Sequence, residues 1–206
     1  MQNLLQQQWL DLRHRLAGHV DAHSSFSLRI PGEKAMWLGK LDDLEPTKVI
    51  WAASRDENMQ THTAIYLTRN DVGAILLGGG AFSNCLADFG GVLPVLFDEQ
   101  ARHLGYMGAP VVEQKQLAQA LLRGANVLLV RGVPACLGAT GTRMALNAEL
   151  FEKCSKAYTL AKATGARLTH LPWWVGFIAN GRLMKDEKRA AQCFARGQLP
   201  PESRGY

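Results

Sequence analysis

The sequence predicts a layered α/β domain, and three observations favour this class. Short apolar runs of strand length alternate with segments whose apolar residues recur at helical spacing. Of the 206 residues, 47% are hydrophobic and 20% are charged, which suits one buried core and excludes the disordered, collagen-like and low-complexity classes. No linker or internal repeat interrupts the alternation, so we expect a single domain over residues 1–206.

The first part of the chain is expected to form a helix, a hairpin and a second helix. Leu5, Trp9 and Leu16 recur at helical spacing before Gly18, which indicates an amphipathic helix that ends there. Apolar and polar residues then alternate up to the turn pair Pro31-Gly32, which is typical of a strand hairpin. The expected elements are a helix at 4–16, strands at 25–30, 35–38 and 48–52, a helix at 58–68 and a strand at 72–77.

The second part continues the alternation. A glycine triplet at 78–80 follows the strand at 72–77 directly, and a helix is expected to begin near residue 82. Two apolar runs flank Arg131-Gly132 and predict a second hairpin. The further expected elements are an apolar segment at 92–97, helices at 98–104 and 113–122, a short strand near 111, strands at 127–130 and 133–137, a long helix at 142–163, and a basic helical tail at 173–206.

Composition also limits the partners. The formal net charge is +5, and residues 182–206 hold six basic and three acidic side chains. This stretch lacks the interleaved aromatic residues of a nucleic-acid surface, so we expect no nucleic-acid partner. No run reaches the roughly 20 apolar residues of a membrane-spanning helix, and the N-terminus has no signal-peptide pattern. We therefore expect a cytoplasmic protein without a membrane partner.

Neither cysteine nor histidine spacing indicates a metal or redox site. The four cysteines form no C-x-x-C pair and lie in apolar surroundings, so we expect buried free thiols. His14, His19 and His23 are spaced five and four residues apart, and the last two could grip a metal if they shared a helix face. Gly18 indicates that the helix has already ended, which favours a solvated trio. The cysteines are Cys85, Cys136, Cys154 and Cys193.

The glycine triplet is the first candidate binding feature. Its backbone allows close approach of a ligand, and a following helix N-terminus attracts anions. Gly78 and Gly80 supply the start of a dinucleotide fingerprint, but Ser83 occupies the position of its third glycine. A tight strand-to-helix turn is therefore favoured over nucleotide binding.

Arg131 is the second candidate, because it interrupts the apolar run at 127–133. A desolvated guanidinium is costly unless it is paired. Two interpretations stay open. A carboxylate such as Glu57 or Asp88 would make Arg131 structural, and an empty pocket beside it would make an anion site.

Taken in order, four segments resemble the class II aldolase/adducin family over roughly residues 5 to 165. They are 25–32 (SFSLRIPG), 61–66 (THTAIY), 71–76 (DVGAIL) and 126–132 (NVLLVRG). His62 and Tyr66 match the H-x-x-x-Y spacing of the family's helix, and Gly132, followed by the long helix, matches its H-G landmark. The resemblance, together with the alternation of strands and helices, implies a three-layer α/β/α fold around a mixed, largely antiparallel sheet.

The departures from the family lie where its chemistry resides. The resemblance matches Leu77, Gly79 and Arg131 with the family's three zinc-binding histidines, and Asn58 with its proton-transferring glutamate. Leu and Gly offer no side-chain ligand, and a guanidinium repels a divalent cation, so we expect no metal and no cofactor.

The segments that match the family's phosphate-binding loops differ as well. Ser24-Ser25 stands where Gly-Asn is expected, and Trp37-Leu38-Gly39 replaces a small hydroxyl-plus-glycine turn. Asp56-Glu57 stands at the paired serines, where two carboxylates would repel a sugar phosphate.

Two functional hypotheses follow. The first is a metal-free aldolase-like pseudoenzyme that acts as a binding or assembly protein. The alternative is a lyase or isomerase for a small anionic sugar-derived substrate, in which Arg131 replaces the metal beside Asn58 and the amides of Gly78, Gly79 and Gly80. A zinc aldolase built on His14, His19 or His23 is disfavoured. The resemblance also implies a homo-oligomer, in the first instance a tetramer, in which Trp173 and Trp174 contact a neighbour or the core.

Overall fold

A computed structural model describes residues 2–52, 56–121 and 124–202. Within them, six strands form one sheet in the order β3-β2-β1-β4-β6-β5, and every neighbouring pair is antiparallel. A parallel contact is added at the β5 edge by an isolated bridge between Val111 and Val130. The predicted mixed, largely antiparallel sheet is thus confirmed. The strands are β1 (Ser25–Arg29), β2 (Ala35–Lys40), β3 (Thr47–Ile50), β4 (Ala74–Leu77), β5 (Val127–Val130) and β6 (Val133–Gly138).

Both predicted hairpins are present. In the first, Leu28 of β1 lies opposite Trp37 of β2. In the second, Val130 lies opposite Val133, so only two residues turn the chain from β5 into β6. These two, Arg131 and Gly132, have φ angles of 52° and 82°. Positive φ at both central positions is what a two-residue hairpin needs to match the strand twist.

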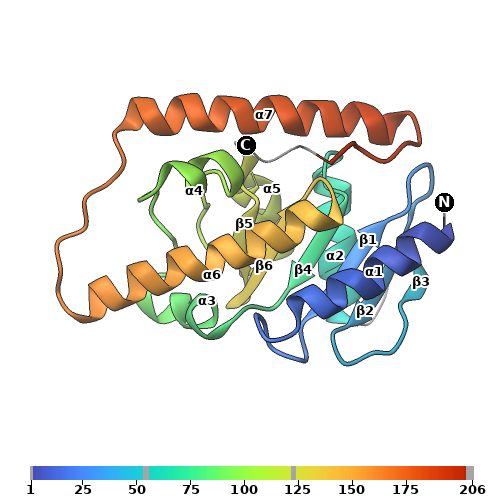
Figure 1. The fold of residues 1–206 in the computed structure, drawn as a ribbon, viewed down its shortest axis with the longest axis horizontal. Coiled ribbons are helices and arrows are strands. Elements are labelled where there is room, and N and C mark those ends of the chain that lie inside the picture. Colours follow the sequence, from blue (N-terminus) through green and yellow to red (C-terminus); the bar gives the residue numbers. More distant parts are fainter. Residues whose placement is uncertain (1, 53–55, 122–123, 203–206) are drawn as a thin grey trace.

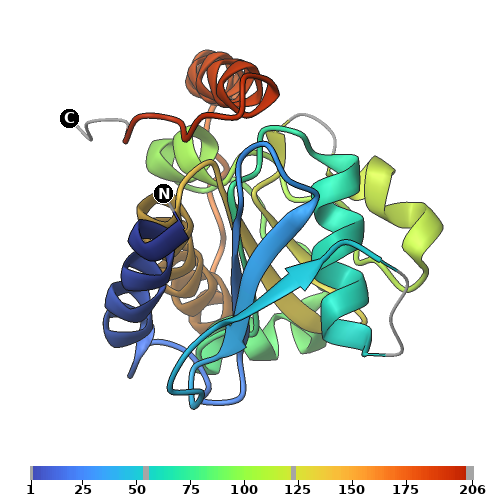
Figure 2. The same cartoon turned by 90° about the vertical axis from the view of Figure 1, so that its right-hand side faces the viewer.

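Helices cover both faces of the sheet, which confirms the three predicted layers. Figure 2 shows α1 and α6 on one side of the sheet and α2 and α5 on the other. The helices are α1 (Gln2–Leu16), α2 (Glu57–Thr68), α3 (Ala81–Asn84), α4 (Asp98–His103), α5 (Leu117–Ala120), α6 (Gly141–Ala163) and α7 (Trp173–Ala195), with short 3-10 turns η1 (Cys85–Phe89) and η2 (Gln114–Gln116). Of the helices in the described residues, none is long and apolar enough to cross a bilayer.

Alternate residues of the central strands supply two cores. Leu76 of β4 is buried in a cluster with Trp9 and Phe151 from α1 and α6. Its neighbour Ile75 is buried in a second cluster with Ile65 of α2. This division follows from the strand period of two, which sends successive side chains to opposite faces.

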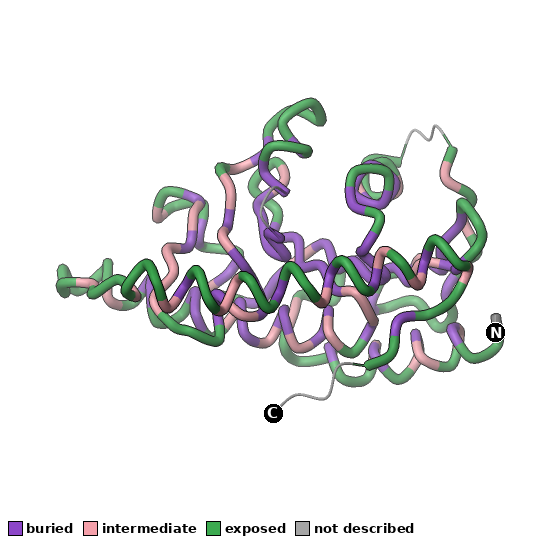
Figure 3. The backbone as a smooth tube through the Cα atoms, turned by 90° about the horizontal axis from the view of Figure 1, so that it is seen from above, coloured by how far each residue is buried: buried purple, intermediate pink, exposed green. Residues whose placement is uncertain are grey.

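The last helix, α7, lies across one end of the sheet beside α4 (Figure 1). It buries one stripe of side chains, which includes Leu183, Ala190 and Phe194. Seen from above, most of its outer side is exposed (Figure 3). The helix predicted to begin near Trp173 is therefore present.

Two expectations were wrong in detail. The helix expected at 113–122 is divided into η2 and α5, because the Gln116 side chain caps the backbone of Glu113 at 2.9 Å and holds the first turn in 3-10 geometry; residue 122 lies outside the described residues. Cys85 is exposed and Cys193 is half-buried, whereas Cys136 and Cys154 are buried as expected. Cys85 begins η1, a short turn at the surface rather than a core element.

Candidate functional site

Three of the positions singled out in the sequence line one pocket. This strand-end pocket has a volume of about 180 Å³ and lies where β4 ends, β5 turns into β6 and α2 begins. Arg131, Asn58 and Leu77 all line it, so residues 73 positions apart in the chain meet there. The complete lining is Glu57, Asn58, Thr61, Leu77, Val130, Arg131 and Val133.

Local structure fixes the position of α2 at this pocket. The Asp56 carboxylate accepts a hydrogen bond from the Met59 backbone N–H at 2.8 Å and so caps the helix N-terminus. The helix therefore starts at Glu57, and both Glu57 and Asn58 lie in its first turn. Arg131 faces them from the β5–β6 turn.

Arg131 is less buried than its apolar sequence context predicted. Its side chain is 46% exposed, because the two-residue turn lifts it out of the sheet. The guanidinium Nη1 lies 3.0 Å from Oε2 of Glu57, whose side chain is 77% exposed. Of the two partners left open by the sequence, Glu57 is the one observed. An ion pair this exposed contributes only about 0–1 kcal/mol to stability, so it holds the Arg131 side chain in place only weakly.

The glycine turn does not join this pocket. The Glu152 carboxylate from α6 accepts hydrogen bonds from the backbone N–H groups of Phe82 and Ser83 at 2.8 and 2.9 Å, and one from the Ser83 hydroxyl at 2.7 Å. The amides at the start of α3 are thus occupied by the chain's own carboxylate, and the Gly78 amide donates to the Pro134 carbonyl at 2.8 Å. A Cβ on Gly80 would lie 2.5 Å from Glu152, and one on Gly78 or Gly79 would collide with Ser24 or Ser83. These glycines allow close packing, and a ligand-binding role for them stays a prediction.

His62 and Tyr66, which carry part of the family resemblance, belong to the core. His62 Nδ1 and Nε2 lie 2.9 and 3.1 Å from the hydroxyls of Ser27 and Ser25, and the Tyr66 hydroxyl lies 2.9 Å from that of Ser27. Burial lowers the pKa of His62 to about 3 and raises the pKa of Tyr66. This buried network ties α2 to β1.

The residues of the strand-end pocket do not fit a zinc ion. Leu77, which lines the pocket, has no side-chain donor atom, and Arg131 is a cation; Gly79, the third position matched with a zinc ligand, has no side chain and lies outside the pocket. In the part of the chain that the structure describes, no three His, Cys, Asp or Glu side chains are grouped to hold a metal. His14, His19 and His23 are exposed, as expected. That the purified protein carries no zinc stays a prediction, to be checked by elemental analysis.

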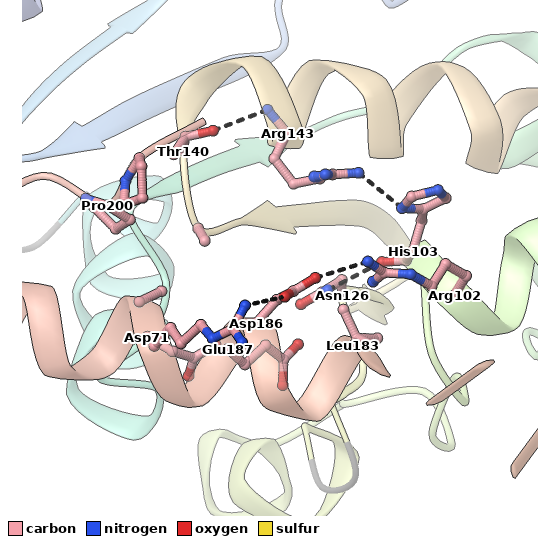
Figure 4. A pocket seen from close by; sticks show the side chains of 14 residues that line it. Asp71, Arg102, His103, Asn126, Thr140, Arg143, Leu183, Asp186, Glu187 and Pro200 are labelled. Atoms are coloured by element: carbon pink, nitrogen blue, oxygen red, sulfur yellow. Dashed lines mark hydrogen bonds and ion pairs between the residues drawn. The ribbon is translucent and has the colours of Figure 1, made fainter. Parts of the chain in front are cut away.

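A second cavity lies at the opposite end of the sheet and was not anticipated from the sequence. This α7 pocket has a volume of about 160 Å³ and lies between α7, α4 and the start of α6 (Figure 4). Asp71 precedes β4, and Asn126 precedes β5, so both stand at the ends of these strands that face away from the strand-end pocket. The polar lining is Asp71, Arg102, His103, Asn126, Thr140, Arg143, Asp186, Glu187 and Arg189.

A buried ion network forms one wall of the α7 pocket. Arg69 makes a bidentate salt bridge with Asp71, in which Nε and Nη2 donate to the two carboxylate oxygens at 2.7 and 2.6 Å. Its Nη2 also lies 3.0 Å from Oε1 of Glu187 on α7. Burial raises the pKa of Glu187 to about 7 although Arg69 opposes the shift. The Glu187 carboxyl therefore changes its charge close to neutral pH.

A histidine and two arginines face this network across the cavity. Arg143 Nη1 lies 2.8 Å from Nδ1 of His103, and since a guanidinium can only donate, Nδ1 accepts and the ring proton resides on Nε2. Burial, with Arg143 and Arg102 nearby, lowers the pKa of His103 to about 4. Arg102 in turn contacts Asp186 at 2.8 Å.

Sequence reasoning missed this pocket because its residues share no motif. They come from six separate stretches of the chain and have no common spacing. The one local signal was the pair Arg69 and Asp71, two charges that flank the start of an apolar strand and turn out to be buried.

Comparison with known proteins identifies the fold. No family model matches the chain, and no curated protein matches it significantly. Solved structures do match. YgbL from Klebsiella pneumoniae, described provisionally as an aldolase, epimerase or decarboxylase, superimposes with a TM-score of 0.72 at 15% identity, over 87% of this chain and 99% of YgbL.

Two further structures agree with this result. An L-fuculose 1-phosphate aldolase gives a TM-score of 0.72 at 15% identity, over 87% of this chain and 96% of its own. An aldolase II superfamily protein from Pseudomonas syringae gives 0.62 at 16% identity, over 95% of both chains. The similarity to class II aldolases predicted from the sequence is thus confirmed at the level of the fold.

Proposed function

We propose that this chain, which has the class II aldolase fold, binds a small carboxylate in the strand-end pocket without a bound metal. The observation that carries the proposal is that Arg131 and Asn58 line one pocket together with Leu77. A cation and a carboxamide thereby stand at positions that the resemblance matches with a zinc ligand and the proton-transferring glutamate.

The chemistry of the pocket supports an anionic ligand. The planar guanidinium of Arg131 matches both oxygens of a carboxylate. Its present partner Glu57 is so exposed that a ligand carboxylate can take its place at low cost. Asn58 adds amide donors at the same rim, whereas the Thr61 hydroxyl donates to the Glu57 backbone carbonyl at 2.9 Å. A pocket of about 180 Å³ suits a ligand of only a few carbon atoms.

An isomerase or lyase is the second candidate function, and the position of Glu57 favours it. Its carboxylate stands one residue before Asn58 and 3.0 Å from Arg131. Glu57 would accept a proton from a carbon next to a carbonyl as that C–H bond breaks. The electron pair would move to the carbonyl oxygen, where Arg131 would stabilise the negative charge. If that carbon carries a hydroxyl, transfer of the hydroxyl proton to the former carbonyl oxygen and return of the first proton to the former carbonyl carbon would complete an isomerisation.

Thermal denaturation with and without lactate tests the binding proposal. For a dissociation constant of about 1 mM, lactate at about 10 mM adds roughly 1.4 kcal/mol of stability, a melting shift of about 3 to 5 °C. The comparison is made in a protein that carries Arg143→Met, which weakens the α7 pocket. There Arg131→Leu should remove the shift, and Arg182→Leu, the same change at an exposed position on α7, should keep it. An equal shift with and without Arg131→Leu in that protein would refute the proposal.

Deuterium exchange separates the two candidates. Hydroxypyruvate offers a carboxylate for Arg131 and an exchangeable C–H beside its ketone. If the enzyme reading holds, the wild type should accelerate uptake of deuterium from D2O at that carbon, and Glu57→Gln should not. Binding of hydroxypyruvate without acceleration would leave the binding protein as the function.

We also propose a homo-oligomer in the cytoplasm, with the tetramer implied by the resemblance as the working assembly. The described cysteines are all free thiols, which suits a reducing compartment. Exposed aromatic side chains on α7, among them Trp173, Trp174 and Phe177, support contact with a neighbouring copy.

A further inference from the structure

We propose that the α7 pocket is a second binding site, which takes a small hydroxy-carboxylate independently of the strand-end pocket. The two pockets lie at opposite ends of the same strands. Asp71 precedes β4 and Leu77 ends it, so the four residues of this strand separate them by about 13 Å. The proposal therefore does not rest on the function proposed for Arg131.

Three guanidinium groups supply the carboxylate-binding end. Arg102 of α4, Arg143 of α6 and Arg189 of α7 all line the cavity. Asp186 lies between two of them, 2.8 Å from Arg102 and 3.7 Å from Arg189. Burial lowers the pKa of Arg143, and the charge of Arg102 lowers it further, which means that two like charges are held close together. A bound carboxylate would offset this repulsion.

His103 adds a neutral donor to the same end. Because its Nδ1 accepts from Arg143, its Nε2 carries the proton and can donate to a ligand oxygen. His103 is buried, so this donor is held in place by packing.

Glu187 supplies an acceptor for the ligand hydroxyl. Its side chain lines the cavity and is buried, and its Oε1 lies 3.0 Å from the Arg69 guanidinium. A carboxylate has several acceptor sites, so Glu187 can accept a further hydrogen bond from a ligand hydroxyl.

The size and the apolar wall of the cavity set the length of the ligand. A volume of about 160 Å³ has room for about five water molecules at roughly 30 Å³ each, which corresponds to an acid of three or four carbons. Leu183 and Ala190 of α7, with Pro200 and Pro201 of the C-terminal segment, line the remaining surface and suit a short carbon chain.

Isothermal titration with glycerate tests this site, and the Arg131→Leu protein is the background for every measurement. Absence of glycerate binding to this protein concerns the α7 pocket alone, because Arg131→Leu has removed the carboxylate-binding side chain of the strand-end pocket. We expect glycerate to bind at millimolar concentration. Arg143→Met should weaken binding at least about 10-fold through loss of a charge-assisted hydrogen bond. Arg182→Met, an exposed arginine on α7 outside the cavity, is the matched control and should leave binding unchanged.

Two further variants guard against misfolding. Leu183→Phe fills the cavity while every charge remains, and Arg189→Met changes a side chain at the exposed rim that cannot unfold the domain. Both should weaken glycerate binding. The proposal would be overturned if folded Arg143→Met and Arg189→Met bound glycerate with unchanged affinity. It would also be overturned if glycerate did not bind at about 50 mM, which is about 50 times an expected dissociation constant of about 1 mM.

Two other probes fix the class of ligand. Propionate lacks the hydroxyls and should bind at least about 10-fold more weakly than glycerate, because it makes no hydrogen bond to Glu187. Inorganic phosphate that bound as tightly as glycerate, with the same loss in Arg143→Met, would replace the hydroxy-carboxylate with a phosphate ligand and refute the class stated here.

Discussion

At Arg131 the backbone conformation and the ion pair with Glu57 affect the stability of the fold separately. The residue has a φ of 52°, which costs a residue with a Cβ more than it costs glycine. Its ion pair with Glu57 is exposed, so the pair offsets little of the cost of the positive φ.

We therefore predict that Arg131→Gly stabilises the fold by about 1 kcal/mol and that Arg131→Leu changes stability by less than about 1 kcal/mol, as measured by urea denaturation. A pairing with Glu57 was expected from the sequence to make Arg131 structural, but both side chains are so exposed that loss of the arginine strands no buried carboxylate. A loss of about 3 kcal/mol or more in Arg131→Leu would contradict this prediction.

His62 makes stability depend on acid pH. Its pKa is about 3 in the folded chain against 6.5 in the unfolded one, so below pH 6.5 the unfolded state takes up a proton that the folded state does not. This single group then removes stability as the pH falls, about 2 kcal/mol between pH 6.5 and pH 5. The contribution is complete only above pH 6.5.

The expected result is that His62→Gln, which keeps polar contacts with Ser25 and Ser27, loses less melting temperature than the wild type between pH 7 and pH 5. The difference between the two proteins is the readout, because Glu187, with its raised pKa, titrates in the opposite sense: it stabilises the fold as the pH falls through 7. Parallel melting curves of the two proteins across this range would show that His62 takes no part.

At the scale of elements, the ion network of Arg69, Asp71 and Glu187 fastens α7 to the sheet. Removal of one member of a buried pair typically costs about 3–5 kcal/mol, because the remaining charges are stranded. We predict a loss of that size for Arg69→Met and less than about 1 kcal/mol for Arg102→Met, whose ion pair with Asp186 is much more exposed.

Calorimetry of the same proteins tests the proposed single domain over residues 1–206. If α7 belongs to the domain that contains the sheet, the wild type should unfold in one transition, since the network couples the two. A separate low-temperature transition that disappears when α7 is removed would mean that the helical tail is an independent unit.

At the scale of the whole molecule, the outer side of α7 is the surface best suited to a second copy. Trp173, Trp174 and Phe177 are 79%, 55% and 70% exposed. Together they present roughly 300–500 Å² of aromatic surface, a large part of the ~800 Å² that one partner buries in a standard interface. Gly181 lies beside them on the same face. Glycine inside a helix costs about 1 kcal/mol, and no described atom lies within 4 Å of its missing Cβ, so a closely approaching helix would explain it.

Charge favours an antiparallel pairing of two α7 helices. The aromatic half of the helix is followed by Lys185 and Lys188, and reversal of one helix brings these cations over the partner's rings instead of over each other. Light scattering should give a mass of at least twice 22.6 kDa for the wild type. Trp173→Glu with Phe177→Glu should lower it, and Leu44→Glu, at a leucine that is also 79% exposed, should not. A wild-type mass of 22.6 kDa would contradict the assembly.

Local pattern determined much of this molecule. The period of two in the strands, the period of 3.6 in α1 and α6, and the turn at Arg131-Gly132 predicted both hairpins and the long helices, because these features depend on neighbours a few residues away. The family resemblance predicted that Arg131 lies beside Asn58, and both residues line one pocket together with Leu77.

Only the tertiary structure decided what surrounds those residues. Glu152 reaches the glycine turn from about 70 positions away, the two-residue turn exposes Arg131, and Arg143 meets His103 across 40 positions to line a cavity at the other end of the sheet. Contacts at such separations depend on how helices pack over the sheet, and no periodicity in the chain encodes them. The sequence determined which elements form, and the packing of α6 and α7 decided which charged side chains meet.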